Sequence, residues 1–378
     1  MDLFEVYKLW DIEPVRGQDT TLWDKDGAEY TDLYGGHAVI SVGHCHPHYV
    51  KTVSEQLGKL GFYSNAVQNG LQKELALKLG RISGYQDYKL FLCNSGAEAI
   101  ENALKLASFA TGKAKILAFN KAFHGRTSGA VSATDNPKIR APFNATENVT
   151  FVQLGDIAAV EKTLASGEYA AVVLEGIQGV AGIFEASSQF WQQLRELCDR
   201  LGVMLIADEI QSGYGRSGKF FAHQHHNVMA DIITTAKGMA NGFPIGGVLI
   251  SPKIKAEYGM LGTTFGGNHL ACSAAIAVLD IIESQKLVEN AARIGEYFKN
   301  AFAGPQGLDK ALVEYRGRGL MIGLEVKEEY SDLRNRLLFE KHFFTGAAGA
   351  KVIRLLPSLT VSEETAQKFI NDWKELTA

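Results

Sequence analysis

The order of apolar and polar positions along the chain predicts strands that alternate with helices. Short apolar runs are followed by segments in which apolar residues recur at intervals of three and four, the spacing of a helix with one buried face. Runs this apolar are typical of strands that are covered on both faces. The repeated strand–helix–strand order predicts a mainly parallel sheet with right-handed crossovers. The predicted strands are 88–93, 116–119, 149–152, 171–174, 203–207, 231–236 and 248–251.

The composition of the chain changes near residue 285, where charged residues become more frequent around helical stripes. Three further strands in this part predict a smaller α+β unit. They are 313–315, 321–326 and 352–357. We therefore expect a large domain over 46–275 and a small domain formed by 1–45 and 276–378.

Composition and charge exclude several classes of protein. The chain has 378 residues, is 46% hydrophobic and carries a net charge of −4, which gives no electrostatic case for nucleic acid or an anionic membrane surface. No apolar run approaches the roughly 20 residues that span a bilayer. The first residues include acids where a signal peptide has basic residues. The four cysteines lack CxxC spacing and fit reduced thiols, so we expect a cytoplasmic protein.

An acid and a lysine follow two of the predicted core strands. Asp208 comes after the run 203–207, and Lys237 after the run 231–236. Open α/β sheets bind ligands at the carboxyl ends of their strands, so the two side chains should meet there. A carboxylate that holds a protonated ring nitrogen and an amine that forms a Schiff base are the groups that pyridoxal phosphate chemistry needs. Acids and lysines at strand ends are also common without any such function.

A phosphate site is indicated where the strand 88–93 leads into a helix. Ser95 and Glu98 form a predicted capping box, and Gly96 and Ala97 would expose backbone N–H groups at the start of the helix. The helix dipole favours an anion at this position. The alternative is that Ser95 is only a helix cap.

Three other segments carry candidate binding groups. Phe123 could cover one face of a planar cofactor, and Arg126 could hold a carboxylate. Arg354 lies within an apolar strand, where a buried cation needs a partner or an anionic ligand. Tyr63 and Ser64 lie in a predicted loop that is either surface or a substrate wall.

Two histidine-rich segments suggest other readings. His44, Cys45, His46 and His48 are too close together to complete a tetrahedral metal site easily, so we expect no metal. The run 223–226 contains three histidines and lies at no strand end, so we interpret it as a solvated loop.

Six segments, in this order, resemble the motif set of the class III (ω-amino acid) aminotransferases. They are 94–99, 123–127, 175–179, 208–218, 236–238 and 263–268. The resemblance runs nearly end to end. It implies a fold-type I α/β enzyme that uses pyridoxal 5′-phosphate, with a seven-stranded, mainly parallel sheet and a smaller α+β domain. It also implies a homodimer with active sites at the subunit interface.

The resemblance also implies roles for individual residues. Lys237 would bind the cofactor covalently and carry a proton, while Asp208 would pair with the ring nitrogen. Arg126 would bind the distal carboxylate and Arg354 the α-carboxylate of glutamate. The remaining cofactor contacts would come from Ser95, Gly96, Ala97, Gln211, Phe123 and, from the partner subunit, Thr264. Tyr63, Ser64 and Thr263 are the other candidate substrate residues.

The resemblance is greatest to family members that act on acetylornithine in arginine biosynthesis. We expect transfer of the terminal amino group of N2-acetylornithine or a related acylornithine to 2-oxoglutarate. The alternatives are ornithine, succinylornithine or another ω-amino acid as donor, and an aminomutase reaction. A cofactor-binding regulator would need a DNA-binding module, for which the chain has no room.

Relatives commonly have Pro and Glu where this chain has Gly176 and Val180. We therefore hypothesise that another group serves Arg354, or that the amino donor differs.

Overall fold

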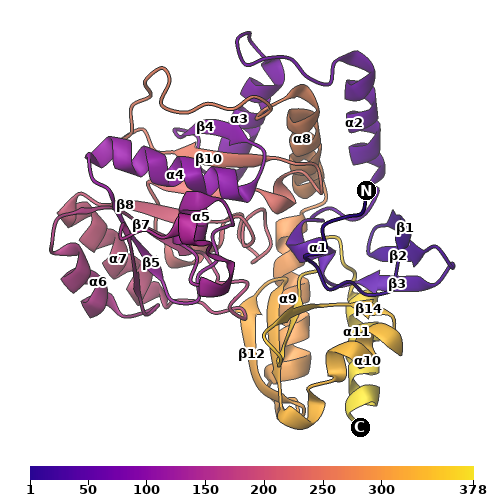
Figure 1. Cartoon of the computed structure of the whole chain (residues 1–378). Coiled ribbons are helices and arrows are strands. Elements are labelled where there is room, and N and C mark those ends of the chain that lie inside the picture. Colours follow the sequence, from indigo (N-terminus) through magenta and orange to yellow (C-terminus); the bar gives the residue numbers. More distant parts are fainter.

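The computed structural model describes residues 1–378 and contains a central sheet of seven strands (Figure 1). The strand order is β4-β10-β9-β8-β7-β5-β6. β10 runs antiparallel to both of its neighbours, and the other pairings are parallel, which confirms the mainly parallel sheet. The strands are β4 (Lys89–Cys93), β5 (Lys115–Phe119), β6 (Val149–Val152), β7 (Tyr169–Glu175), β8 (Met204–Asp208), β9 (Ile232–Thr235) and β10 (Gly246–Ile250).

Helices cover the central sheet, and their ends follow from local capping. Ser187 caps α7 (Ser188–Leu201) by accepting a hydrogen bond from the backbone N–H of Phe190 at 3.1 Å. The same helix ends at Gly202, whose φ of 63° suits glycine. α4 crosses the strands β7 to β10. The other helices of this part are α2 (Pro47–Lys59), α3 (Gly70–Ser83), α4 (Gly96–Thr111), α5 (Ser128–Ser132), α6 (Ile157–Leu164) and α8 (His269–Ser284).

The C-terminal part forms a second sheet, as predicted from the strands near residues 313, 321 and 352. Its order is β12-β13-β16-β15. Its strands are β12 (Leu312–Arg318), β13 (Met321–Val326), β15 (Gly346–Ala348) and β16 (Val352–Leu355), with the two-residue β11 (Gly307–Leu308) beside them. Its helices are α9 (Leu287–Ala303), α10 (Leu333–Phe339) and α11 (Glu363–Thr377).

A third sheet joins the N-terminal and C-terminal parts of the chain through β3 and β14, which lie side by side in Figure 1. β1 (Pro14–Gln18), β2 (Thr21–Asp24) and β3 (Glu29–Asp32) form an antiparallel meander, and β3 pairs in parallel with β14 (Phe343–Phe344). The short helix α1 (Gly35–Ala38) follows β3. The domain boundaries remain a prediction, and the one at 275/276 falls within α8.

The segment 223–226 is not a solvated loop, so that interpretation was wrong. It lies in a 3-10 helix, Ala222–His226, and the side chains of His223 and His226 are buried. His223 Nδ1 lies 2.7 Å from Glu209, and its Nε2 lies 2.6 Å from the hydroxyl of Tyr85. Buried polar partners far away in the sequence stabilise the ring in the core.

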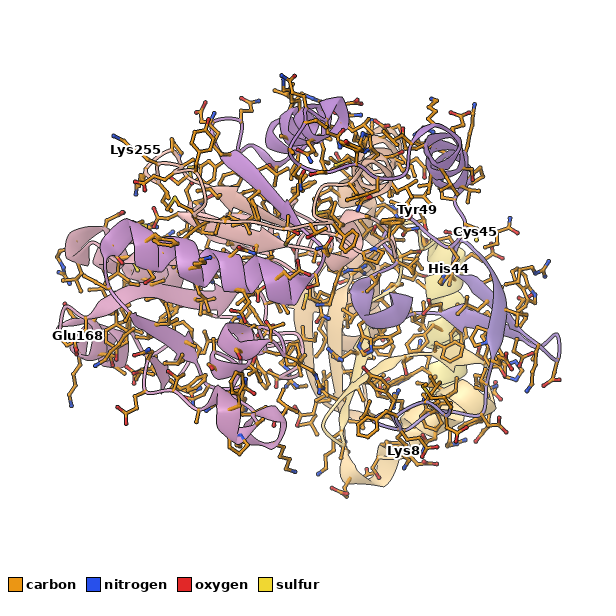
Figure 2. The ribbon with its side chains drawn as sticks, turned by 45° about the horizontal axis from the view of Figure 1, so that its top comes forward. Lys8, His44, Cys45, Tyr49, Glu168 and Lys255 are labelled. Carbon is orange, nitrogen blue, oxygen red and sulfur yellow. The ribbon has the colours of Figure 1, made fainter.

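The histidines of 44–48 bind different partners. Figure 2 shows His44 and Cys45 in the segment that leads into α2. His44 Nε2 lies 2.8 Å from Asp32, and His46 Nε2 lies 2.9 Å from the Gln285 amide. The Cys45 thiol is exposed and free.

No helix has both the length and the apolar character needed to cross a membrane.

α9 packs closely against the β12–β13 turn, so we expect a methyl group added at this contact to lower the free energy of unfolding. A Cβ at Gly295 would lie 2.3 Å from the carbonyl oxygen of Gly319. Gly295→Ala should therefore lower the free energy of unfolding by about 1–3 kcal/mol, measured by urea denaturation. Gly70→Ala, which has no atom within 4 Å of the new Cβ, should change it by less than about 0.5 kcal/mol. Equal losses in both variants would contradict this packing.

Candidate active site

A cavity of about 780 Å³ opens at the carboxyl ends of β7, β8 and β9. Its lining includes residues of the N-terminal segment, turn residues after the central strands, and Arg354 from β16. The predicted site residues that line this cavity are Ser95, Gly96, Ala97, Phe123, Arg126, Asp208, Gln211, Lys237 and Arg354. The structure therefore brings together groups that are separated by up to 259 positions (354 − 95) in the sequence.

Asp208 ends β8 and is held by hydrogen bonds on both carboxylate oxygens. Its Oδ2 accepts from His124 Nδ1 at 2.7 Å, and its Oδ1 accepts from the backbone N–H of Ile210 at 3.0 Å. The side chains of Asp208 and His124 are both buried, so the contact fixes the direction of the carboxylate. Sequence reasoning gave His124 no role, although it follows Phe123 directly in the same loop.

Glu175 lies beside Asp208 because the two residues are register partners on β7 and β8. Its carboxylate accepts from the backbone N–H groups of Phe123 and Gly179, both at 3.0 Å. Burial, opposed by His124 and reinforced by the charge of Asp208, raises the pKa of Glu175 to about 7. Burial alone would lower the pKa of His124, but the hydrogen bond and charge of Asp208 raise it. Glu175 is a second site residue to which the sequence assigned no role.

Lys237 follows β9 and starts a 3-10 turn, Lys237–Met239. Its φ is 45°, a left-handed conformation that costs a non-glycine residue about 1–2 kcal/mol. The next residue holds this turn, because the Ser41 hydroxyl donates to the Gly238 carbonyl at 2.7 Å. Burial lowers the pKa of the Lys237 amine; Asp208 and Glu175 oppose this and Arg354 adds to it. A lowered pKa increases the fraction of the nucleophilic, uncharged amine.

The N-terminus of α4 has the backbone geometry that is typical of an anion-binding site. Ser95 is the N-cap and accepts from the backbone N–H of Glu98 at 3.2 Å, which confirms the cap. Glu98 in turn accepts from the backbone N–H of Asn94 at 3.1 Å. A Cβ on Gly96 would lie 2.8 Å from the side chain of Ile210, so glycine lets the turn approach the strand ends. Phosphate binding at this turn stays a prediction.

The two arginines differ in their surroundings. Arg126 is exposed and makes no ion pair. Arg354 is only 4% exposed and makes no ion pair either; its guanidinium donates to the carbonyls of Ala347 and Gly179 and to the hydroxyl of Tyr34, each at 3.0 Å. Burial lowers the pKa of Arg354, which Tyr34 and Glu175 oppose. The groups that accept hydrogen bonds from Arg354 in this structure are therefore neutral.

Four predicted residues lie outside the cavity of their own chain: Tyr63, Ser64, Thr263 and Thr264. They occupy two loops that contact each other, since Asn65 Nδ2 donates to the Gly266 carbonyl at 3.0 Å. Thr264 and Tyr63 are exposed. Thr263 accepts a hydrogen bond from Asn94 Nδ2 at 3.3 Å, next to the start of α4.

Comparison with known proteins gives a consistent result. The family model described as aminotransferase class-III matches residues 6–376. An acetylornithine aminotransferase from Archaeoglobus fulgidus is 39% identical over 97% of this chain and 96% of the relative. The structure of an ornithine aminotransferase from Toxoplasma gondii has a TM-score of 0.92 at 28% identity, over 99% of this chain and 92% of that one. An N-acetylornithine aminotransferase from Stenotrophomonas maltophilia has a TM-score of 0.82 at 32% identity, over 97% and 95%.

The raised pKa of Glu175 predicts a pH effect on stability. A carboxyl whose pKa is raised in the folded state stabilises the fold below its unfolded pKa, and this contribution is lost as the pH rises through the folded value. Without cofactor, the free energy of unfolding of the wild type should thus fall relative to Glu175→Gln between about pH 4.5 and about pH 7. Urea denaturation at a series of pH values measures the difference. Glu196→Gln, which changes an exposed carboxylate without an ion pair, should run parallel to the wild type; parallel curves for Glu175→Gln would contradict the assignment.

Proposed function

Since the chain belongs to the class III aminotransferase family, we propose that it transfers the terminal amino group of N2-acetylornithine, or of a related acylornithine, to 2-oxoglutarate. The products are N-acetylglutamate 5-semialdehyde and glutamate, and the reaction belongs to arginine biosynthesis. The observation that carries this proposal is a single cavity in which Lys237, Asp208 and two arginines meet. The relatives named as acetylornithine aminotransferases support the substrate.

The enzyme depends on pyridoxal 5′-phosphate, whose ring withdraws electrons from the carbon that loses or gains a proton. Two features of the cavity fit this cofactor. The side-chain oxygen of Gln211, Oε1, is buried and has no partner. A Cβ on Gly96 would lie 2.8 Å from the side chain of Ile210, so glycine lets the N-terminus of α4 come close to the strand ends that carry Asp208. The residues that would hold the cofactor are Ser95, Gly96, Ala97, Phe123, Asp208, Gln211, Lys237 and, across the dimer, the partner's Thr264.

Each side chain near the reacting centre has a separate task. Asp208 supplies the negative charge that keeps the ring nitrogen protonated, and His124 fixes the direction of that carboxylate. Lys237 would hold the cofactor covalently, and its amine would be the group that moves a proton at the substrate carbon. A positioned base of this kind typically accelerates proton transfer by about 10²–10⁴-fold.

The two arginines bind the carboxylates of the substrates. Arg126 at the rim pairs with the carboxylate far from the reacting carbon, and buried Arg354 pairs with the α-carboxylate of glutamate. Tyr63, Ser64 and Thr263 would line the outer part of the substrate path when a second copy is present.

A homodimer is the assembly that would complete the site. The exposed loops with Tyr63 and Thr264 lie outside the site cavity of their own chain, so they are available to a second copy. Exposed apolar side chains on α2 and these loops support burial against a partner. They are Val50, Leu57, Leu60, Phe62, Tyr63, Val67 and Phe265. The four free cysteines are consistent with the reducing conditions of the cytoplasm, where we place the enzyme.

A donor panel tests the proposed reaction. Acetylornithine, succinylornithine, ornithine, 4-aminobutyrate and lysine are each supplied with 2-oxoglutarate, and glutamate is measured. An acylornithine should give the largest kcat/KM, and Lys237→Ala should lower it by about 10³-fold or more. Borohydride reduction and peptide mapping should attach the cofactor to Lys237. Product formation without 2-oxoglutarate would indicate the aminomutase alternative, and an adduct on another lysine would overturn the assignment.

A further inference from the structure

Arg354 faces a problem that follows from the proposed function, on which this inference rests. Glutamate carries a carboxylate on its reacting carbon, whereas a donor that reacts at a terminal amine carries no carboxylate on that carbon. In the second case, the buried guanidinium receives no anion from the substrate. A buried charge without an anionic partner is unfavourable, so its remaining hydrogen-bond acceptors matter more. Val180, the cavity residue next to Gly179, is apolar and offers no carboxylate.

The hydroxyl of Tyr34 is the one side-chain acceptor that contacts Arg354. Arg354 Nη2 lies 3.0 Å from it, and the same hydroxyl lies 2.5 Å from His37 Nδ1. A guanidinium has only donors, so the tyrosine oxygen accepts from Arg354 and its proton points to His37. This chain of hydrogen bonds requires His37 Nδ1 to be unprotonated. Burial, followed by the charges of Arg354 and Lys237, lowers the pKa of His37, and burial raises the pKa of Tyr34, so both acceptors are neutral.

The local backbone holds this pair in an unusual conformation. The four residues of α1, Gly35, Gly36, His37 and Ala38, all have positive φ, between 54° and 69°. For His37 and Ala38, which carry a Cβ, this left-handed conformation is unfavourable. The carboxylate of Asp32 holds its start by accepting from the backbone N–H of Tyr34 at 2.9 Å and of Gly35 at 2.8 Å. Strain that the surroundings maintain in this way is typical of functional sites.

The ring of Tyr34 lies directly on the backbone of β15. A Cβ on Gly346 would lie 2.1 Å from the ring, so only glycine allows this contact. Gly346 is the register partner of Arg354, which places the tyrosine next to the arginine. The ring of His37 meets the ring of Tyr34 edge-on, with 4.8 Å between centroids. The hydroxyl is therefore fixed from three sides, by β15, His37 and Arg354.

We propose that Tyr34, oriented by His37, is a specificity-determining residue that keeps Arg354 hydrogen-bonded while an ω-amine donor occupies the site. With glutamate, the substrate carboxylate binds the same guanidinium, and the tyrosine contributes less. A carboxylate near Val180 would stabilise the Arg354 guanidinium with its negative charge. In this chain, the neutral hydroxyl of Tyr34, held by the neutral imidazole of His37, stabilises it instead. The site needs no movement of a charged side chain when it changes from one substrate to the other.

The test is Tyr34→Phe in the cofactor-loaded enzyme. In a ping-pong reaction, the kcat/KM of each substrate reports its own half-reaction. The ω-amine donor should lose about tenfold or more, the cost of leaving a buried donor unpaired. The kcat/KM for glutamate should change by less than about threefold, and the affinity for glutarate, measured by isothermal titration, should not fall. Adding Val180→Glu to Tyr34→Phe should restore the donor half-reaction by supplying a carboxylate.

Two variants separate positioning from mere structural damage. His37→Asn keeps an acceptor at the place of Nδ1 and tolerates positive φ, so it should retain the wild-type ratio of the two kcat/KM values, while His37→Ala should shift it like Tyr34→Phe. Tyr30→Phe removes the hydroxyl of a buried tyrosine that binds Asp24 at 3.2 Å outside the cavity, and it should leave the ratio unchanged.

The two proposals fail in different ways. A wild-type enzyme that uses no ω-amine would contradict the proposed function and, with it, the role of Tyr34. An active wild type in which Tyr34→Phe lowers both half-reactions equally, or lowers glutarate binding as strongly as donor turnover, would contradict the role of Tyr34 alone.

Discussion

The site depends on placing an acid and an amine at the ends of neighbouring parallel strands, where both side chains face one cavity. The register of β7, β8 and β9 brings the carboxylates of Glu175 and Asp208 to the same edge that Lys237 follows. Burial raises the pKa of Glu175 to about 7, and the charge of Asp208 adds to this effect. The imidazole of His124 offsets the charge of Asp208. Burial of the ring opposes its protonation, and the hydrogen bond and charge of Asp208 outweigh this effect on its pKa.

Local signals in the sequence were sufficient for the elements that carry this arrangement. The bounds of α7 follow from Ser187 and Gly202, and β6 coincides with its apolar run. Lys237 and Asp208 could be placed because each directly follows a core strand. The partners of these residues could not be predicted in the same way. His124 is 84 positions from Asp208, and Tyr34 is 320 positions from Arg354, so no local pattern links them.

The error at 223–226 has the same physical origin. A polar run without apolar spacing normally lies in solvent, but His223 is buried because Glu209 and Tyr85 satisfy both of its ring nitrogens. Glu209 follows Asp208 directly, so this buried network supports the backbone that carries the cofactor acid. A buried histidine with two partners is visible only after folding has brought three distant segments together.

The cavity therefore has two halves with different origins. The central sheet and the turns after its strands contribute Asp208, Lys237 and the start of α4, whereas His37 of α1 and Arg354 of the second sheet line the other side, where Tyr34 contacts Arg354. The two halves are in contact, because Gln211 Nε2 donates to the carbonyl of His37 at 3.2 Å and Arg354 donates to the carbonyl of Gly179 at 3.0 Å. Val180 brings no charge to the cavity, so the neutral hydroxyl of Tyr34 is the side-chain group that contacts Arg354. Under our proposal, this contact matters for a substrate that has no carboxylate on its reacting carbon, and it lies apart from the acid–amine pair.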